Sequence, residues 1–393
     1  MTRYLFVLVL SFVFVSNLMA QPAVGHTTVT FNDPTRSGGF GSGGGPGRQI
    51  QTEIYYPATT AGDNTTAEAG QFPVVIFGHG FLMGWDAYDN IWNKLVEKGY
   101  IVALPRTEGG LSPSHNDFGL DLALLVSKMQ GLNTAVGSPL MGHVAAPTAV
   151  GGHSMGGGAS VLAAGAPGVS AHFALAPAET TPSAIAAAAQ VTVPSVIFSG
   201  SGDGVTPPAQ HQIPIYNALV STCKYHITIS GGGHCYFANT SLTCDLGELL
   251  TIDNVTISRE AQHQVTFEFL VPWLEFWLSG FSQGIADINL GLTNNPGVTV
   301  NQSCINPLGT EETAAFRGFV VFPNPAQAIV EIRHGQDTPC RVQVMDFSGR
   351  VLSDSPLTAS VHTIDISGLT PGVYVLRIEN ARGQASHHRV VKE

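Results

Sequence analysis

Short apolar runs, bounded by glycine or proline and separated by helix-like stretches, most constrain the fold of this chain. The runs read FPVVIFGHG, GYIVALP, PTAVGGHS, AHFALAP, VPSVIFSG and KYHITISG. Runs of this kind are typical of strands that are buried on both faces of a parallel sheet. The helix-like stretches cover 86–98, 117–130, 155–166, 208–221 and 260–279. The alternation predicts an α/β fold, with a mostly parallel open sheet and helices on both of its faces.

Two stretches with polar–apolar alternation precede these runs. Residues 27–32 and 49–57 read as half-buried strands, and the glycine-rich segment 37–47 joins them as a flexible hairpin loop. The loop does not fit a phosphate site, because no helix follows it and no Lys-Ser/Thr pair closes it. We expect the larger domain to span residues 21–305.

The first twenty residues have the pattern of a secretory signal peptide. Arg3 precedes the apolar run 4–15, and Leu18-Met19-Ala20 offers a small residue at the cut. The alternative is a membrane anchor, but the run is too short to span a bilayer comfortably, and no later apolar run is long enough. We therefore predict a cleaved signal peptide at 1–20 and no integral membrane segment.

The charge balance excludes several classes of partner. The net charge is −11 with 17 lysines and arginines, which argues against nucleic acid and against an anionic membrane surface. Apolar residues make up 44% of the chain and charged residues 11%, as in a globular protein. No His-x-x-x-His or Cys-x-x-Cys pair is present, so the sequence shows no metal site. We expect no cofactor, and we expect a monomer.

From about residue 318 the pattern changes to alternating strands with Ser-Gly, Pro-Gly and Arg-Gly turns. This predicts a small all-β sandwich over 318–393, after a polar linker at 306–317. The tail resembles the type IX sorting domain of Bacteroidota, and the resemblance is carried by Pro323-Asn324-Pro325, the DFSGR stretch at 346–350, the LTPGVY stretch at 369–374 and the terminal Lys392-Glu393. It implies recognition by the type IX secretion machinery and export through the periplasm and outer membrane, to a secreted or cell-surface location. The alternative is a β-domain that binds a ligand or a surface.

Gly152-His153-Ser154-Met155-Gly156 matches the G-x-S-x-G elbow on which serine hydrolases carry their nucleophile. Because glycine supplies 45 of the 393 residues, a serine is flanked in this way by chance about 1% of the time. Indeed Ser282, within GFSQG, also matches. Only Ser154 has a buried strand before it and a helix of small residues after it, whereas Ser282 follows an aromatic helix. We predict Ser154 as the nucleophile, with Ser282 as the alternative.

In serine hydrolases with this elbow, the nucleophile comes first along the chain, the acid second and the histidine third. This order restricts which residues can be the partners of Ser154. Asp203 follows the strand VPSVIFSG in a glycine-rich turn, which is the strand-end position that the acid requires, and Glu179 is the alternative. His234 lies in a loop after the last strand, behind three glycines that permit unusual backbone angles and a close approach. We predict His234 as the base. The other histidines that follow Asp203 in the larger domain are expected to be structural: His211, His226 and His263.

The oxyanion of an acyl-transfer intermediate needs hydrogen-bond donors. We expect these to be the backbone N–H groups of Met155, which follows the nucleophile, and of Phe81, in the loop after the strand FPVVIFGHG, with Leu82 as the alternative register. His79 precedes this loop. We expect it to pack at the strand end, and its alternative role is to donate to or shape the pocket.

The chain has five cysteines, so at least one lies outside intramolecular pairs or bonds to another chain. Export makes disulfides possible. Our hypothesis pairs Cys235 with Cys244, which would staple the loop of His234. It also pairs Cys223 with Cys304, which would clip the end of the larger domain to the last strand. Four cysteines allow three pairings, and the sequence does not choose among them.

These residues together resemble the α/β-hydrolases, and within them the cutinase-like polyesterases that include bacterial poly(ethylene terephthalate) hydrolases. The resemblance spans residues 48–280 and is carried by IYYP at 54–57, Gly80-Phe81, GHSMGGG at 152–158, Asp203 and His234. GHSMGGG also occurs in dienelactone-hydrolase-like and chlorophyllase-like enzymes. Two stretches depart from the polyesterases: LAPAETTP lacks their tryptophan, and the loop 106–119 is not theirs.

The resemblance implies a secreted serine ester hydrolase that acts through an acyl-enzyme intermediate. Its substrate would be an ester or a polyester. No insertion large enough for a lid of two helices separates the core strands, which favours an open cleft and bulky or polymeric esters. The alternatives are a peptidase or thioesterase on the same fold, and a surface-binding protein without catalysis.

Overall fold

The computed structural model describes residues 22–251, 254–281, 283–304, 319–323, 325–334, 340–346, 350–357, 361–380 and 385–392. The predicted signal peptide at 1–20, the predicted linker at 306–317 and Ser282 lie outside the described residues. None of the helices within the described ranges is both long and apolar enough to cross a bilayer.

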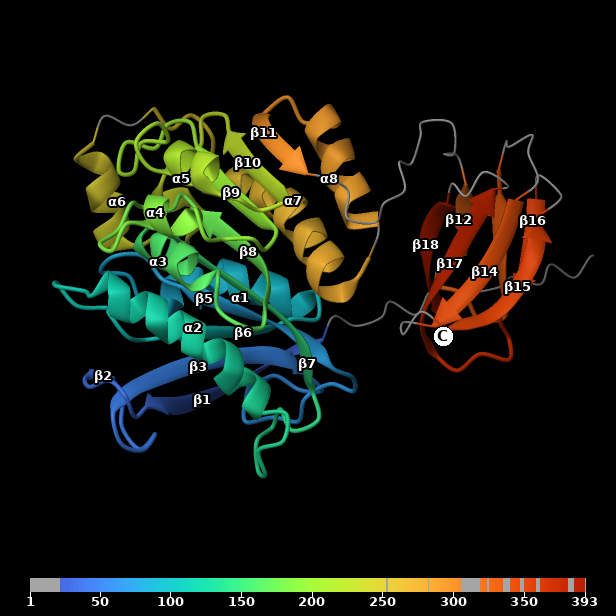
Figure 1. Ribbon diagram of the computed structural model, residues 1–393, viewed down its shortest axis with the longest axis horizontal. Coiled ribbons are helices and arrows are strands. Elements are labelled where there is room, and N and C mark those ends of the chain that lie inside the picture. Colours follow the sequence, from blue (N-terminus) through green and yellow to red (C-terminus); the bar gives the residue numbers. More distant parts are fainter. Residues whose placement is uncertain are drawn as a thin grey trace, which may run out of the picture.

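Within the described residues, eleven strands form the sheet of the larger domain (Figure 1). Their order is β11-β10-β9-β8-β7-β5-β6-β3-β1-β4, and β2 pairs with β3. The six strands from β10 to β6 in this order run parallel to their neighbours, and they are the six apolar runs of the sequence. Antiparallel pairs flank them, β3 with β6 and β1 on one side and β11 on the other. The predicted α/β fold class is therefore confirmed. The strands are β1 (Ala23–Asp33), β2 (Gly39–Phe40), β3 (Arg48–Ala58), β4 (Gly62–Asp63), β5 (Phe72–Gly78), β6 (Ile101–Pro105), β7 (Val144–His153), β8 (Val169–Leu175), β9 (Ser195–Gly200), β10 (Cys223–Ile229) and β11 (Val298–Cys304).

Helices cover both faces of this sheet because successive side chains of a strand point to opposite faces. In β5, Val75 and Phe77 join a core that includes residues of α1, α7 and α8, while Val74 and Ile76 join a second core with residues of α2 and α3. A smaller core lies under α4 and α5. The helices are η1 (Trp85–Tyr88), α1 (Asp89–Glu97), α2 (His115–Gly131), α3 (Met155–Ala163), α4 (Ala184–Ala188), α5 (Gln212–Ala218), η2 (Cys235–Phe237), α6 (Leu242–Leu249), α7 (Arg259–Ser279) and α8 (Gln283–Asn294).

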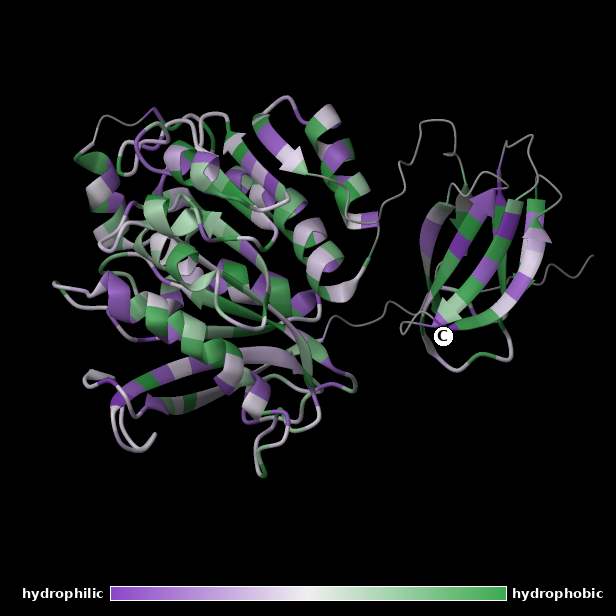
Figure 2. Ribbon diagram, viewed as in Figure 1, coloured by the Kyte–Doolittle hydropathy of each residue, from purple (hydrophilic) through white to green (hydrophobic). Residues whose placement is uncertain are grey.

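The C-terminal region is built from two antiparallel sheets, as the sequence predicts. One sheet has the order β12-β13-β16 and the other β15-β14-β17-β18. Both contribute to one apolar core, with Val330 and Ile332 from the first and Val344 and Leu376 from the second. Figure 2 shows apolar residues alternating with polar ones along these strands. The strands are β12 (Val320–Phe322), β13 (Ile329–Arg333), β14 (Cys340–Asp346), β15 (Val351–Leu357), β16 (Val361–Asp365), β17 (Gly372–Asn380) and β18 (Ala385–Lys392).

Two buried histidines of the parallel strands predict how stability responds to acid. His172 and His226 each contact a serine through Nε2, at 3.0 and 2.7 Å, and the Nδ1 atom of each has no hydrogen-bond partner among the described residues. Burial lowers the pKa of His172 to about 3 and that of His226 to about 4, from an ordinary value of 6.5. In the unfolded chain both rings take up protons near pH 6.5, so the unfolded state binds more protons below that pH. Their contribution to stability is complete above about pH 6.5 and declines as the pH falls towards 4.

We therefore expect the free energy of unfolding to fall as the pH is lowered from 7 to 5. Each of the two rings contributes a slope of up to about 1.4 kcal/mol per pH unit. Urea unfolding at several pH values measures this slope. A His226→Gln variant keeps a polar group near Ser199 and removes one titrating ring, so its slope should be shallower than that of the wild type. Equal slopes would show that His226 protonates normally in the folded state.

Candidate active site

Ser154 sits in a sharp turn between β7 and α3. Its backbone has φ +55° and ψ −119°, in a region that a residue with a side chain seldom adopts. The flanking glycines are required by close packing: a Cβ at Gly152 would overlap the carbonyl oxygen of Gly156, and a Cβ at Gly156 would overlap that of Gly78. The G-x-S-x-G spacing therefore brings α3 against β5 and β7 and presents the Ser154 hydroxyl at the end of the sheet.

The structure brings the three predicted residues of the site together. The Oγ atom of Ser154 lies 2.9 Å from Nε2 of His234, and Nδ1 of His234 lies 2.9 Å from Oδ2 of Asp203. Asp203 and His234 are buried, and Ser154 is 8% exposed. A carboxylate accepts only, so the Nδ1–H group of neutral His234 donates to Asp203, and Nε2 is left to accept the proton of the serine hydroxyl.

Thr206 fixes the carboxylate of Asp203. Its N–H donates to Oδ1 at 2.7 Å, and its hydroxyl lies 2.9 Å from Oδ2 and 2.9 Å from Nδ1 of His234. Gln212 of α5 donates to both the hydroxyl and the carbonyl oxygen of Thr206. Thr206 was not predicted from the sequence, although an aspartate followed three residues later by threonine is the spacing of a local side-chain-to-backbone turn.

Glycines and one glutamine hold the loop of His234. Gly231 has φ +70°, and a Cβ at Gly233 would overlap the carboxylate of Glu248. The side chain of Gln262, in α7, accepts from the N–H of Gly233 at 2.8 Å and donates to its carbonyl oxygen at 2.9 Å. The three glycines thus let the chain turn and pass close to α6 and α7, which places the imidazole over the sheet end.

A buried hydrogen-bonded chain links this loop to the loop after β5. The N–H of Gly80 donates to the Tyr88 hydroxyl at 2.8 Å, and that hydroxyl lies 2.8 Å from Nδ1 of His153. Nε2 of His153 lies 3.0 Å from the carbonyl oxygen of His234. A carbonyl only accepts, so Nε2 of His153 carries the proton and Tyr88 donates to Nδ1. Burial, and secondarily the neighbouring His234, hold the pKa of His153 well below its ordinary value.

The two predicted oxyanion donors belong to the turn at the start of α3 and to the turn after β5. Met155 is the first residue of α3, where a backbone N–H has no acceptor within the helix. Phe81 lies in the turn after β5, and its side chain is 47% exposed. In the described part of the chain neither N–H group has a hydrogen-bond acceptor. His79 is buried, with its ring nitrogens 2.9 Å from the carbonyl oxygens of Gly80 and Thr107, which is the packing role expected for it.

Comparison with known proteins identifies the family of this chain. A family model for PET hydrolase-like proteins matches residues 16–252. The chain belongs to the PET hydrolase-like family. Residues 320–393 match the secretion system C-terminal sorting domain, which confirms the predicted type IX sorting tail and indicates export to the cell surface or secretion. The bis(hydroxyethyl) terephthalate hydrolase of Streptomyces coelicolor is 27% identical over 207 residues, which are 52% of this chain and 58% of that protein. The match thus spans little more than half the length of that relative.

The alternative residues considered for the site of this PET hydrolase-like chain have other partners. Oε2 of Glu179 accepts from the N–H of Ile185 at 3.0 Å, and the N–H of Glu179 donates to Nδ1 of His211 at 2.9 Å. His263, in α7, contacts Asn90 and the carbonyl oxygen of Ala238. His226 bonds to Ser199 within the sheet. No hydrogen bond joins these side chains to Ser154 or His234 within the described residues.

Both hypothesised disulfides are present in this PET hydrolase-like chain. Cys235 bonds to Cys244, next to His234, and Cys223 bonds to Cys304 directly across the β10–β11 pair. The strand β11 was not predicted, and it brings Cys304 opposite Cys223. Cys340 lies in β14, buried and outside both disulfides.

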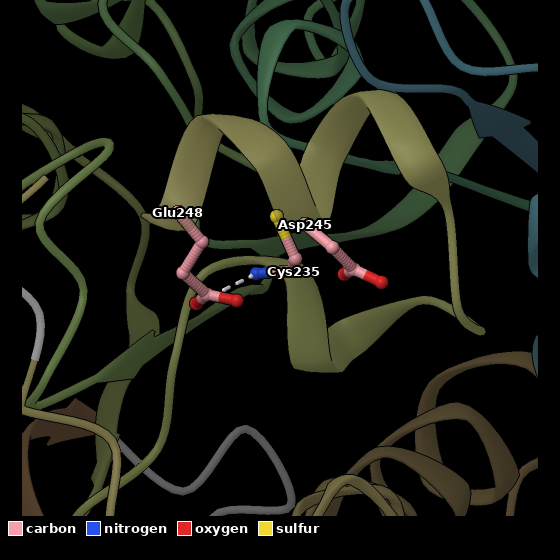
Figure 3. A group of neighbouring side chains, drawn as sticks. All are labelled: Cys235, Asp245 and Glu248. Atoms are coloured by element: carbon pink, nitrogen blue, oxygen red, sulfur yellow. Dashed lines mark hydrogen bonds between the residues drawn. The ribbon is translucent and has the colours of Figure 1, made fainter. Parts of the chain in front are cut away.

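Cys235, Asp245 and Glu248 form a group that is close enough to hold a cation (Figure 3). The chemistry of the group does not suit one. The sulfur of Cys235 is bonded to Cys244, so it is not a thiolate ligand. Asp245 pairs with Arg259 at 2.8 Å, and Glu248 accepts from the N–H of Cys235. Glu248 thus ties the C-terminal end of α6 directly to the loop of His234, and Asp245 does so through Arg259, which also donates to the carbonyl oxygen of Cys235.

Proposed function

We propose that this chain is a secreted serine ester hydrolase, a carboxylesterase of cutinase-like type that acts on esters and polyesters. The observation that carries the proposal is the line of hydrogen bonds from Ser154 through His234 to Asp203 at the carboxyl ends of the parallel strands. Membership of the PET hydrolase-like family and the partial likeness to a bis(hydroxyethyl) terephthalate hydrolase support the substrate class.

In the first half of the reaction the Ser154 oxygen attacks the acyl carbon while Nε2 of His234 takes the hydroxyl proton. The N–H groups of Met155 and Phe81 donate to the oxyanion that forms. The intermediate then collapses, and His234 returns the proton to the departing alkoxide. The alcohol leaves, and the acyl group stays on Ser154 as an ester.

In the second half, His234 takes a proton from water as the water oxygen attacks the acyl-enzyme. The new oxyanion uses the same two N–H donors, and its collapse breaks the bond to Ser154, whose oxygen regains a proton from His234. Asp203 accepts from Nδ1–H, so that Nε2 faces the serine and the transient imidazolium is stabilised.

Turnover of soluble substrates by the full chain tests this proposal. We expect hydrolysis of p-nitrophenyl butyrate and bis(2-hydroxyethyl) terephthalate, and slower or no hydrolysis of the matching anilide, because an amide nitrogen must be protonated before the C–N bond breaks. Faster cleavage of the anilide would make the protein a peptidase, and faster cleavage of a butyryl thioester would make it a thioesterase. Binding to polyester without turnover of any substrate would make it a surface-binding protein.

A further inference from the structure

The helix α6 carries an apolar face that is largely exposed among the described residues. Its leucines lie at positions i, i+4, i+7 and i+8 and are 85%, 53%, 81% and 79% exposed: Leu242, Leu246, Leu249 and Leu250. At 3.6 residues per turn, these positions share a stripe about 100° wide. A stripe of this kind in a globular domain ordinarily faces the core, so its exposure needs an explanation. In Figure 2, which has the view of Figure 1, apolar residues are visible on α6 at the left of the larger domain.

The helix α6 is fastened to the loop of His234 and to the loop after β5. Cys244 in α6 is joined by a disulfide to Cys235, the residue after His234. Thr243 donates to the carbonyl oxygen of Leu82 at 3.0 Å, beside the half-exposed ring of Phe81. The leucine stripe therefore begins next to the loop that we propose for the oxyanion donors, and it has a fixed position relative to the proposed nucleophile.

The charged residues of α6 lie away from the stripe. Asp245 pairs with Arg259, whose guanidinium also donates to the carbonyl oxygens of Cys235 and Ala238. Glu248 is buried and accepts from the N–H of Cys235. In Figure 3 both carboxylates extend to the same side of α6 as Cys235. The outer face is thus left without charge, which suits an uncharged apolar partner and disfavours an ionic one.

The area of the stripe favours an extended apolar surface as its partner over a second copy of the chain. Four exposed leucine side chains offer roughly 300 Å² of apolar surface. Two copies that met through this face would bury roughly 600 Å², well below the ~1,200 Å² at the lower limit for stable protein interfaces. An extended solid surface imposes no such limit, because adsorption to it needs only an exposed apolar face.

We propose that the leucine stripe of α6 is the face through which this protein docks on a water-insoluble, uncharged ester polymer. The inference rests on the proposed function. Contact through α6 holds the polymer surface at the mouth of the site, next to Phe81 and Ser154, so that ester groups at the surface are presented at high local concentration. Small soluble esters reach Ser154 by diffusion and do not need this face.

The test compares two variants of the full chain on soluble and solid substrates. Leu242→Ser combined with Leu249→Ser removes the two most exposed leucines of the stripe, and Leu290→Ser, at a 59% exposed position on α8, is the matched control. For the double variant we expect kcat/KM on p-nitrophenyl butyrate within about twofold of the wild type. Its adsorption to amorphous poly(ethylene terephthalate) film, and its product release from that film, should fall by about tenfold or more, since each leucine loses apolar burial. The control should match the wild type in all three assays.

Unchanged adsorption and unchanged product release from film in the double variant would overturn the docking proposal. So would a wild type that is dimeric in sedimentation while the double variant is monomeric, because the stripe would then belong to a second copy. Loss of binding to phosphatidylcholine vesicles with undiminished film adsorption would also overturn it, in favour of a lipid surface. Failure of the proposed function is distinct from all of these, since the wild type itself would then not hydrolyse p-nitrophenyl butyrate.

Discussion

Replacing Ser154 by alanine should remove nearly all ester turnover, with a fall in kcat on the order of 10⁶-fold. The alanine cannot form the acyl-enzyme, and the line of hydrogen bonds from His234 to Asp203 then has no nucleophile to activate. The measurement is kcat on p-nitrophenyl butyrate with protein whose folding is verified by its thermal midpoint. Alanine removes only the hydroxyl and demands no new space in the elbow, so the midpoint should stay close to that of the wild type.

Ser282 offers the matched control for this experiment, because it is the second serine in a G-x-S-x-G pattern. We expect Ser282→Ala to leave kcat and KM within about twofold, as is usual when no catalytic group is touched. Full turnover in Ser154→Ala would exclude Ser154 as the nucleophile. If Ser282→Ala then lost activity, the nucleophile would have to be assigned to the second pattern.

Asparagine at position 203 should lower kcat by about 10⁴-fold with the fold intact. An amide in place of the carboxylate presents an N–H group to His234 and so favours the tautomer whose Nε2 carries the proton and cannot accept from Ser154. The N–H of Thr206 can still donate to the amide oxygen at the place of Oδ1, and its hydroxyl can turn to accept from the amide nitrogen at the place of Oδ2, so the side chain at 203 should keep its position and the loss should be one of chemistry. Steady-state kinetics on the same ester separate the two effects: kcat falls and KM changes little.

The control for this prediction is Glu179→Gln, at the alternative acid. The carboxylate of Glu179 accepts from the N–H of Ile185 at the start of α4, and its backbone contacts His211 instead of His234. We therefore expect Glu179→Gln to keep its kcat within a few-fold of the wild type. A large loss of kcat in Glu179→Gln, together with a small one in Asp203→Asn, would reverse the assignment of the acid.

Much of the fold and of the site could be predicted because the relevant signals are local. The six parallel strands were visible as apolar runs, since burial on both faces leaves no polar alternation to obscure them. Ser154 was separated from Ser282 by the strand before it and the helix after it. Asp203 and His234 followed from strand-end positions, and the three glycines before His234 indicated a loop that passes close to other backbone.

The remaining features depend on contacts between segments far apart in sequence. Nothing local marks Tyr88 or His153 as partners, because their hydrogen bond joins η1 to the end of β7. The strand β11 has alternating, mostly exposed residues and lies at the edge of the sheet in the described part of the chain, so it lacked the apolar signature of the central strands. The helix α6 was not predicted either: it has 8 residues, so its leucine pattern covers little more than two turns.

The chain of contacts from Gly80 through Tyr88 and His153 to His234 has a consequence for how the site tolerates change. It links the loop after β5, which would donate to the oxyanion, to the loop of His234, which would carry the proton. The contacts involve neither the serine hydroxyl nor the imidazole of His234. The two loops are therefore coupled. A substitution that shifts one loop should also shift the other, so the changes in unfolding free energy and in activation free energy from substitutions in both loops should not simply add.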